Sequence, residues 1–289
     1  MDRPPTPRRG LFRPRKKNPL RGLGAWSLGA LGFYALLVLG YVVFEKKLVF
    51  QGTSLPPDFQ FSFPQNFEER WYESAPGVRL HALYFRTDSV PRRGVVFYLH
   101  GNRDNLARWG RYAPDFTRRG YDVLMVDYRG YGKSTGTIAT EADFHADVRF
   151  VYERLKRNVP EDSLVVYGRS LGTGAATRLA AATHPRRLLL ETPYFTMPAV
   201  FWSQVPLLPY GRLSRFPLRS DEWIGRVRCP VHLFHGTADW VVPYRHSLWL
   251  CQKRGEDPAP MLTTIAAGGH KNLSEFPAYQ MALDSVLKR

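Results

Sequence analysis

Residues 163–174 read SLVVYGRSLGTG and contain a short apolar run that leads directly into Gly-Arg-Ser-Leu-Gly. The small residues at 173–182 predict a helix, so the stretch consists of a strand, a tight turn and a helix. Such a turn holds Ser170 in a strained backbone conformation, and glycine at 168 and 172 removes the Cβ atoms that would collide there. We therefore predict that Gly168 and Gly172 are steric requirements for an exposed Ser170 Oγ.

Strand-like and helix-like patterns alternate on both sides of this stretch. Residues 94–99 form an almost uninterrupted apolar run, which is typical of a strand buried on both faces of a sheet. An antiparallel hairpin is predicted at 68–74 and 78–86, further strands at 121–126, 187–190, 231–234 and 261–266, and helices at 106–119, 141–156, from about 244, and at 274–287. The alternation predicts an α/β domain with a mostly parallel sheet and helices on both of its faces.

Residues 24–44 contain no charged side chain and would place apolar side chains on every face of a helix. At ~1.5 Å per residue such a helix is about 31 Å long, close to the thickness of a bilayer core. A cleaved signal peptide normally has a shorter apolar region and a small-x-small site, and a helix in a protein core shows a polar stripe. We therefore expect an uncleaved single-pass membrane anchor, a basic tail at 1–23, a linker at 45–66 and a folded domain at 67–289.

Positive charge is concentrated near the N-terminus. The formal net charge is +16, and residues 1–47 contain ten Lys or Arg against two acidic residues. Because basic residues resist translocation, the tail is expected in the cytoplasm and the folded domain on the outer side, which is periplasmic in a bacterium. The proline-rich, basic segment 1–23 is expected to be disordered. The rest of the positive excess is spread over 242 residues, which argues against a nucleic-acid interface.

Cys229 and Cys251 are the only cysteines. Two cysteines form neither a disulfide framework nor a cluster of metal ligands, so no metal site is expected from them. One bridge in an oxidising compartment and two buried free thiols both remain open.

A serine on such a turn needs a base, and the base needs an acid to hold it. In folds of this kind the partners follow in the order Ser, Asp or Glu, His, in loops after late strands. Asp239 follows the strand at 231–234, and His270 follows the last strand behind two glycines. The sequence therefore predicts the triad Ser170, Asp239 and His270, with Glu191 as an alternative acid.

An oxyanion hole should complete the site. One donor is expected to be the backbone N–H of Leu171, which directly follows the nucleophile. The second is expected from the loop after the strand at 94–99, which indicates the backbone N–H of Asn102. Removing one such donor typically costs about 3–4 kcal/mol of transition-state stabilisation.

These motifs resemble those of the membrane-anchored α/β-hydrolase-domain proteins, the serine-aminopeptidase and lysophospholipase-like group with one N-terminal transmembrane helix. The resemblance covers the anchor and about residues 50–289, and it rests on five motifs: LHGN at 99–102, DYRGYGKS at 127–134, GRSLG at 168–172, HGTAD at 235–239 and GH at 269–270. It implies the α/β-hydrolase fold, a nucleophile at Ser170, an acid at Asp239, a base at His270 and no cofactor. Ester, thioester and peptide substrates are all compatible with it.

The predicted activity is hydrolysis of carboxylic esters or thioesters with a small or lipid-like acyl group. A short lid is expected at about 192–228, and its large apolar side chains are either the lining of an acyl pocket or ordinary packing: Phe195, Phe201, Trp202, Leu207, Leu208 and Tyr210. An aminopeptidase of the same fold would need an acidic group for the substrate's amino terminus, for which Asp221 and Glu222 are candidates. A membrane-bound scaffold without catalysis is the alternative from another class.

Overall fold

The computed structural model describes residues 19–288, with side chains from residue 29 onward. The chain divides into a unit up to Val43 and a second unit from Phe44 to Arg289. Helix α1 (Pro19–Val49) extends beyond the expected 24–44 span at both ends. It continues through residues 45–49 because neither proline nor glycine interrupts the sequence there. Most of the tail that was expected to be disordered, residues 1–18, lies outside the described residues.

The part of α1 from Gly29 to Val49 is 21 residues long and has a mean hydropathy of 1.4. By length and composition it can cross a membrane, and it lies near the N-terminus, where a signal sequence would have the same properties.

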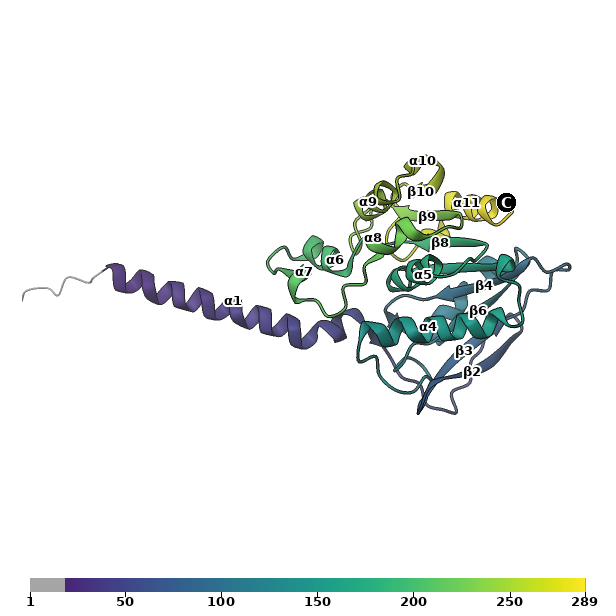
Figure 1. Cartoon of the computed structure of the whole chain (residues 1–289), viewed down its shortest axis with the longest axis horizontal. Coiled ribbons are helices and arrows are strands. Elements are labelled where there is room, and N and C mark those ends of the chain that lie inside the picture. Colours follow the sequence, from purple (N-terminus) through teal and green to yellow (C-terminus); the bar gives the residue numbers. More distant parts are fainter. Residues whose placement is uncertain (1–18, 289) are drawn as a thin grey trace, which may run out of the picture. The chain divides into compact units, whose positions relative to one another are not determined.

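The second unit contains an eight-stranded sheet in the order β10-β9-β8-β7-β4-β6-β3-β2 (Figure 1). Its strands are β2 (Phe67–Ala75), β3 (Val78–Phe85), β4 (Gly94–Leu99), β6 (Tyr121–Val126), β7 (Leu164–Arg169), β8 (Arg187–Glu191), β9 (Val231–Gly236) and β10 (Leu262–Ile265). Strand β3 pairs antiparallel with β2 and β6, and all other neighbours are parallel. The structure confirms the predicted hairpin and the mostly parallel sheet. A separate two-stranded parallel pair joins β1 (Gln51–Gly52) to β5 (Arg103–Asp104).

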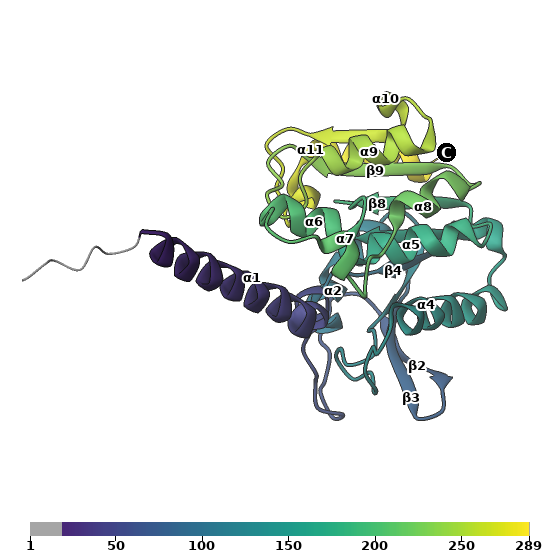
Figure 2. The same ribbon diagram turned by 60° about the vertical axis from the view of Figure 1, so that its left-hand side comes forward.

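Helices cover both faces of the sheet. The longer ones are α4 (Glu141–Lys156), α5 (Leu171–Ala181), α6 (Met197–Gln204), α9 (Arg245–Arg254) and α11 (Pro277–Lys288); the short ones are α2 (Leu106–Trp109), α3 (Pro114–Thr117), α7 (Tyr210–Leu213), α8 (Ser220–Trp223) and α10 (Pro258–Met261). Val95 and Phe97 belong to the core beneath α4 and α5, whereas Val96 and Tyr98 belong to the core beneath α2, α3 and α11. Figure 2 shows α5 between α4 and α8. The alternation along β4 therefore gives the sheet two buried faces.

Two helices illustrate how local sequence sets the boundaries. Helix α4 begins where predicted because Thr140 and Asp143 form a capping box: Asp143 N–H donates to Thr140 Oγ1, and Thr140 N–H donates to Asp143 Oδ2. The helix predicted at 106–119 is instead broken into α2, a 3₁₀ turn and α3. Pro114, which has no N–H for a helical hydrogen bond, begins α3, and Gly110, which follows α2, packs so closely against Phe63 that a Cβ there would overlap the ring.

Candidate active site

Ser170 lies on the turn between β7 and α5 with φ 50° and ψ −118°, a conformation that non-glycine residues rarely adopt. A Cβ on Gly168 would lie 2.7 Å from Thr173 Cα, and a Cβ on Gly172 would overlap the carbonyl oxygen of Leu99. Both glycines are therefore steric requirements of the turn, as predicted. The turn leaves Ser170 Oγ at the carboxyl ends of the strands, where open α/β sheets place their ligands.

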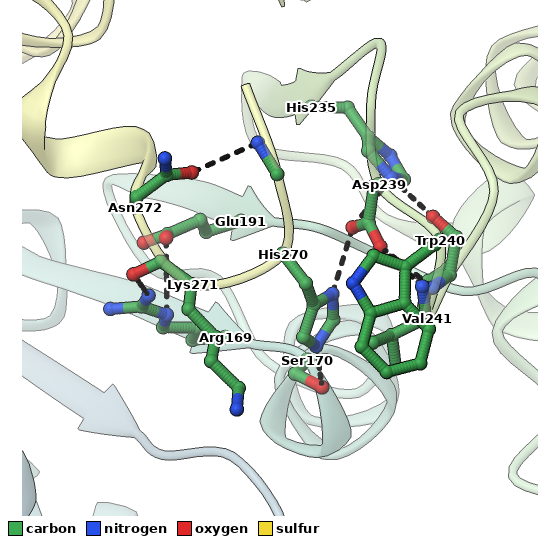
Figure 3. A network of polar contacts seen from close by, with 12 residues as sticks. Arg169, Ser170, Glu191, His235, Asp239, Trp240, Val241, His270, Lys271 and Asn272 are labelled. Atoms are coloured by element: carbon green, nitrogen blue, oxygen red, sulfur yellow. Dashed lines mark hydrogen bonds and ion pairs between the residues drawn. The ribbon is translucent and has the colours of Figure 1, made fainter. Parts of the chain in front are cut away.

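The three residues of the predicted triad lie together (Figure 3). His270 Nε2 is 2.9 Å from Ser170 Oγ, and His270 Nδ1 is 2.8 Å from Asp239 Oδ2. An ionised carboxylate can only accept hydrogen bonds, so Asp239 assigns the ring proton to Nδ1 and leaves Nε2 as an acceptor for the serine hydroxyl. The arrangement has the geometry of a nucleophile, a base and an orienting acid.

The carboxylate of Asp239 is buried and held from several directions. Asp239 Oδ1 accepts hydrogen bonds from the backbone N–H groups of Val241 (2.9 Å) and Val242 (2.8 Å), and His235 Nε2 lies 3.3 Å from Asp239 Oδ2. Burial alone would raise the pKa of Asp239, but the bonds from His235, His270 and Val242 outweigh burial, and the pKa is lowered. Asp239 therefore remains ionised next to His270.

The loop that carries His270 is fixed on both sides. Asn272 Oδ1 accepts the backbone N–H of Gly269 at 2.9 Å, and Arg169 Nη2 donates to the carbonyl oxygen of Lys271 at 2.8 Å (Figure 3). The side chain of Asn272 is therefore used in a hydrogen bond to the backbone of its own loop. Arg169 is the residue directly before the nucleophile, so the same short segment positions both Ser170 and the histidine loop.

Glu191, the alternative acid, lies elsewhere in this network. Its Oε1 is 3.1 Å from Arg169 Nε, and its Oε2 accepts a hydrogen bond from Tyr167 Oη. Both charged side chains of the ion pair are almost completely buried. Glu191 therefore pairs with Arg169, and Asp239 is the carboxylate that contacts His270.

The predicted oxyanion donors flank Ser170. Leu171 is the first residue of α5, so its N–H has no acceptor within the helix. A Cβ on Gly101 would lie 3.6 Å from Ser170 Cβ, which brings the loop containing Asn102 next to the nucleophile. His100 Nδ1 donates to the carbonyl oxygen of Gly101 at 2.8 Å, which holds the peptide that carries the Asn102 N–H. The next peptide is held as well, because the carbonyl oxygen of Asn102 accepts from Gln51 N–H (2.9 Å) and Tyr131 Oη (3.0 Å).

Comparison with known proteins gives both sequence and structural relatives. The sequence model of the family "Serine aminopeptidase, S33" matches residues 90–216. The lysophosphatidylserine lipase ABHD12 of Danio rerio is 31% identical over 173 residues, 52% of this chain and 44% of that protein. An uncharacterized protein of Mycobacterium tuberculosis is 28% identical over 266 residues, 90% of this chain and 93% of its own.

A solved esterase of Pyrococcus furiosus superposes with a TM-score of 0.63 and 18% identity, over 83% of this chain and 98% of that one. A likeness at this identity shows the fold. The chain therefore has the α/β-hydrolase fold.

Ser170 and His270 lie at a cavity of about 290 Å³. More than half of its lining residues are apolar, mainly from residues 48–49, helix α6 and residues 240–242, and its cationic side chains are Arg103 and Lys271. The lining residues are Leu48, Val49, Gln51, Asn102, Arg103, Ser170, Leu171, Tyr194, Met197, Val200, Phe201, Gln204, Trp240, Val241, Val242, His270 and Lys271. Within residues 19–288 no carboxylate belongs to this lining.

Six apolar lid residues were candidates for an acyl pocket. Among the described residues 19–288, Phe201 is the one of these six that lines the cavity. Met197, Val200, Phe201 and Gln204 follow helical spacing and share one face of α6, so Trp202 points away and is half-exposed. Leu207 is exposed and Phe195 borders a separate surface hollow, whereas Leu208 and Tyr210 are buried as packing residues. Of the two alternatives left open for these side chains, the helix register excludes Trp202 from the lining of this cavity.

Asp221 and Glu222, the candidates for binding the amino terminus of a peptide, do not line this cavity. Asp221 binds Arg219 through two hydrogen bonds of 2.8 Å, and Glu222 lies 3.1 Å from the same arginine.

Cys229 and Cys251 are buried and unbridged. Within residues 19–288 no group of three His, Cys, Asp or Glu could hold a metal ion.

Two residues that line the cavity, and a third that binds the lid segment, could not be identified from sequence patterns. Leu48 and Val49 lie about 120 positions before the nucleophile and still line its cavity. Glu45, also buried, accepts hydrogen bonds from the backbone N–H groups of Arg215 (2.9 Å) and Phe216 (3.3 Å) in the lid segment. In the sequence Glu45 stands directly before Lys46 and Lys47 at the end of the apolar stretch, and nothing there indicates a contact with residues 215–216.

Proposed function

We propose that this chain is a serine hydrolase that cleaves carboxylic esters or thioesters through an acyl-enzyme on Ser170. The observation that carries the proposal is the hydrogen-bonded chain from Ser170 Oγ through the His270 ring to the Asp239 carboxylate. It lies at the wall of a cavity large enough for a small acyl group. A protein that served only as a scaffold would have no need for a strained serine beside a histidine–carboxylate pair.

In the proposed mechanism Ser170 Oγ attacks the acyl carbonyl carbon while His270 Nε2 takes the hydroxyl proton. Asp239 holds the ring and stabilises its positive charge, and the N–H groups of Leu171 and Asn102 bind the oxyanion. The proton on His270 then passes to the leaving alcohol or thiol as its bond to the acyl carbon breaks. Water repeats the attack on the acyl-enzyme, with His270 again as the base, and releases the carboxylic acid.

Two features of the cavity support a lipid-like acyl substrate. Its apolar wall, which includes Val49, Val200 and Phe201, suits an alkyl chain, and Arg103 and Lys271 suit an anionic group on the alcohol side. The relative from Danio rerio is named as a lipase of an anionic lysophospholipid, which agrees with this substrate class.

An aminopeptidase remains the alternative because the matching family model carries that name. The positive α-amino group of a peptide would meet Arg103 and Lys271, and Asp221 is occupied by Arg219. This electrostatic mismatch favours esters over aminoacyl amides. Comparing hydrolysis of nitrophenyl esters with that of aminoacyl nitroanilides distinguishes the two activities, and faster cleavage of the anilides would refute the ester assignment.

Phe201→Ala is expected to impair long-chain esters selectively. Because a buried phenylalanine contributes about 1.5–3 kcal/mol of apolar contact, kcat/KM for nitrophenyl dodecanoate should fall about 10- to 100-fold while that for the acetate changes little. Trp202→Ala is the matched control, since Trp202 is the next residue of α6 and points away from the cavity. Equal losses on both esters, or the same chain-length effect from Trp202→Ala, would contradict an acyl pocket at this face.

We further propose that α1 anchors the protein in a membrane, with the basic tail 1–23 in the cytoplasm and the catalytic domain 67–289 on the outer side. The apolar 21-residue span supports the anchor, and the charge asymmetry supports the orientation. In intact cells or spheroplasts, a membrane-impermeant thiol reagent should label Arg226→Cys in the exposed surface of the domain. It should label Arg8→Cys only after permeabilisation. The reverse pattern would refute the orientation, and equal labelling of both would refute the anchor.

A further inference from the structure

A second and larger hollow, of about 1,020 Å³, lies at the amino ends of the parallel strands β4 and β7. It is bordered by β2, β3, the start of β4 and the end of α4, and α4 lies beside the β2–β3 hairpin (Figure 1). Ser170 and Asn102 follow the carboxyl ends of β7 and β4. Of the residues that line this hollow, Ser163 directly precedes β7 and Gly94 is the first residue of β4. The length of a six-residue strand, roughly 20 Å, therefore separates the two sites.

The hollow is strongly basic, and we call it the arginine groove. Six guanidinium groups line it, and three carboxylates, those of Glu68, Glu73 and Asp122, line it or pair with its arginines. The six are Arg70, Arg86, Arg92, Arg93, Arg154 and Arg157. An excess of positive charge in a concave site attracts anions more strongly than the same charges spread over a convex surface.

Three of these arginines share two carboxylates. Glu68 accepts hydrogen bonds from Arg70 and Arg86, and Asp122 lies 3.6 Å from Arg92 and 4.0 Å from Arg86. Burial alone would raise the pKa of Glu68, but Arg70 and Arg86 outweigh it, and the pKa is lowered. Glu68 is thus ionised, and both carboxylates are already paired with arginines, so they hold the guanidinium groups in position without neutralising all of them.

The other three arginines are not neutralised by those carboxylates. Arg154 lies over the ring of Phe150 at 5.1 Å, and Arg93 donates to the carbonyl oxygen of Lys288 at 3.2 Å. Arg157, at the end of α4, is exposed and has no ion-pair partner among residues 19–288. Arg154 and Arg157 therefore provide forked donors that no carboxylate among residues 19–288 pairs with, and their geometry matches phosphate oxygens.

The floor of the groove is apolar and aromatic, with Tyr72, Tyr84, Phe150 and Leu155 among its residues. Arg70 covers one ring, with its guanidinium carbon 3.6 Å from the centre of Tyr84. A site of this volume, with an apolar floor and a rim of guanidinium groups, suits an organic molecule whose charge is carried on phosphate groups.

We propose that the arginine groove binds a soluble ligand that carries two or more negative charges on phosphate groups. A lipid headgroup is the other source of the same chemistry. Leu48 and Val49 are the last residues of the apolar helix, and they line the cavity at the carboxyl ends of the strands. The groove lies at the opposite ends of the strands, and this placement favours a ligand from solution. The inference does not depend on the proposed hydrolase activity.

Titration of the full-length protein in a non-ionic detergent with inorganic tripolyphosphate, followed by calorimetry, tests the proposal. The variant is Arg154→Glu/Arg157→Glu. Because each charge-assisted contact contributes about 1.5–3 kcal/mol, the pair should weaken binding by at least about 10-fold. The matched control is Arg226→Glu/Arg228→Glu, which changes the net charge equally at two exposed arginines outside the groove and should bind as the wild type does.

Saturable 1:1 binding that only the groove variant loses supports the proposal. Equal weakening in the two double variants would show that net charge alone attracts the probe, and unchanged binding in the groove variant would place the ligand elsewhere; both results overturn the proposal. Full displacement of tripolyphosphate by phosphatidylglycerol added to the micelles would assign the groove to lipid headgroups and would overturn it as well. Circular dichroism of each variant checks that the fold is retained.

Discussion

Ser170→Ala is expected to abolish ester hydrolysis. Removing the nucleophile of a serine–histidine–aspartate triad lowers kcat by about a millionfold, to the rate that binding and oxyanion stabilisation alone supply. In this chain the loss should leave the cavity unchanged, because the glycines at 168 and 172 set the turn and the hydroxyl contributes one hydrogen bond to His270. The measurement is hydrolysis of a nitrophenyl ester together with labelling by a fluorophosphonate probe.

The chain offers a matched control in a second serine–histidine pair. Ser203 Oγ is 3.3 Å from His246 Nε2, but it donates to the carbonyl oxygen of Ala199 at 2.8 Å and accepts from Arg245. Burial lowers the pKa of His246 to about 4, and its Nδ1 accepts the N–H of Phe195. Ser203→Ala should therefore label and hydrolyse like the wild type. Labelling that persists in Ser170→Ala, or a wild type that never labels, would refute the proposed nucleophile.

The sheet and the candidate triad could be predicted because their signals are local. The central parallel strands are short, mostly apolar runs, and Ser170, Asp239 and His270 each follow a strand end, so parallel pairing brings them to one edge without further information. The glycines at 168 and 172 could be explained in advance because a Cβ there fails on steric grounds alone.

Features that depend on contacts between distant segments could not be predicted. The close contact of Gly110 with the ring of Phe63, more than forty positions earlier, is not visible in the sequence, and the face of α6 that lines the cavity became known only with the register of that helix. Arg169 and Glu191 form a buried pair that the sequence shows as two unrelated charges. The arginine groove collects residues from four elements, so in the sequence its charge looks evenly spread.

Asp239→Asn is expected to lower kcat by about 10⁴-fold without removing any side-chain volume. Asp239 Oδ1 accepts two backbone N–H groups, from Val241 and Val242, so the amide oxygen of asparagine should take that position. The amide nitrogen then faces His270 Nδ1 and donates to it. The ring proton moves to Nε2, which can no longer accept the proton of Ser170, and the histidine is held in the wrong tautomer.

Glu191→Gln is the comparison that tests which carboxylate acts. It removes the charge that faces the buried Arg169, so it should destabilise the fold by about 3–5 kcal/mol. It should lower kcat of the folded protein far less, because Asp239 still binds His270. Measuring kcat at saturating ester together with Tm separates the two effects. If Glu191→Gln lowered kcat as strongly as Asp239→Asn at a temperature where both are folded, Glu191 would share the role of the acid, and the assignment of Asp239 alone would be wrong.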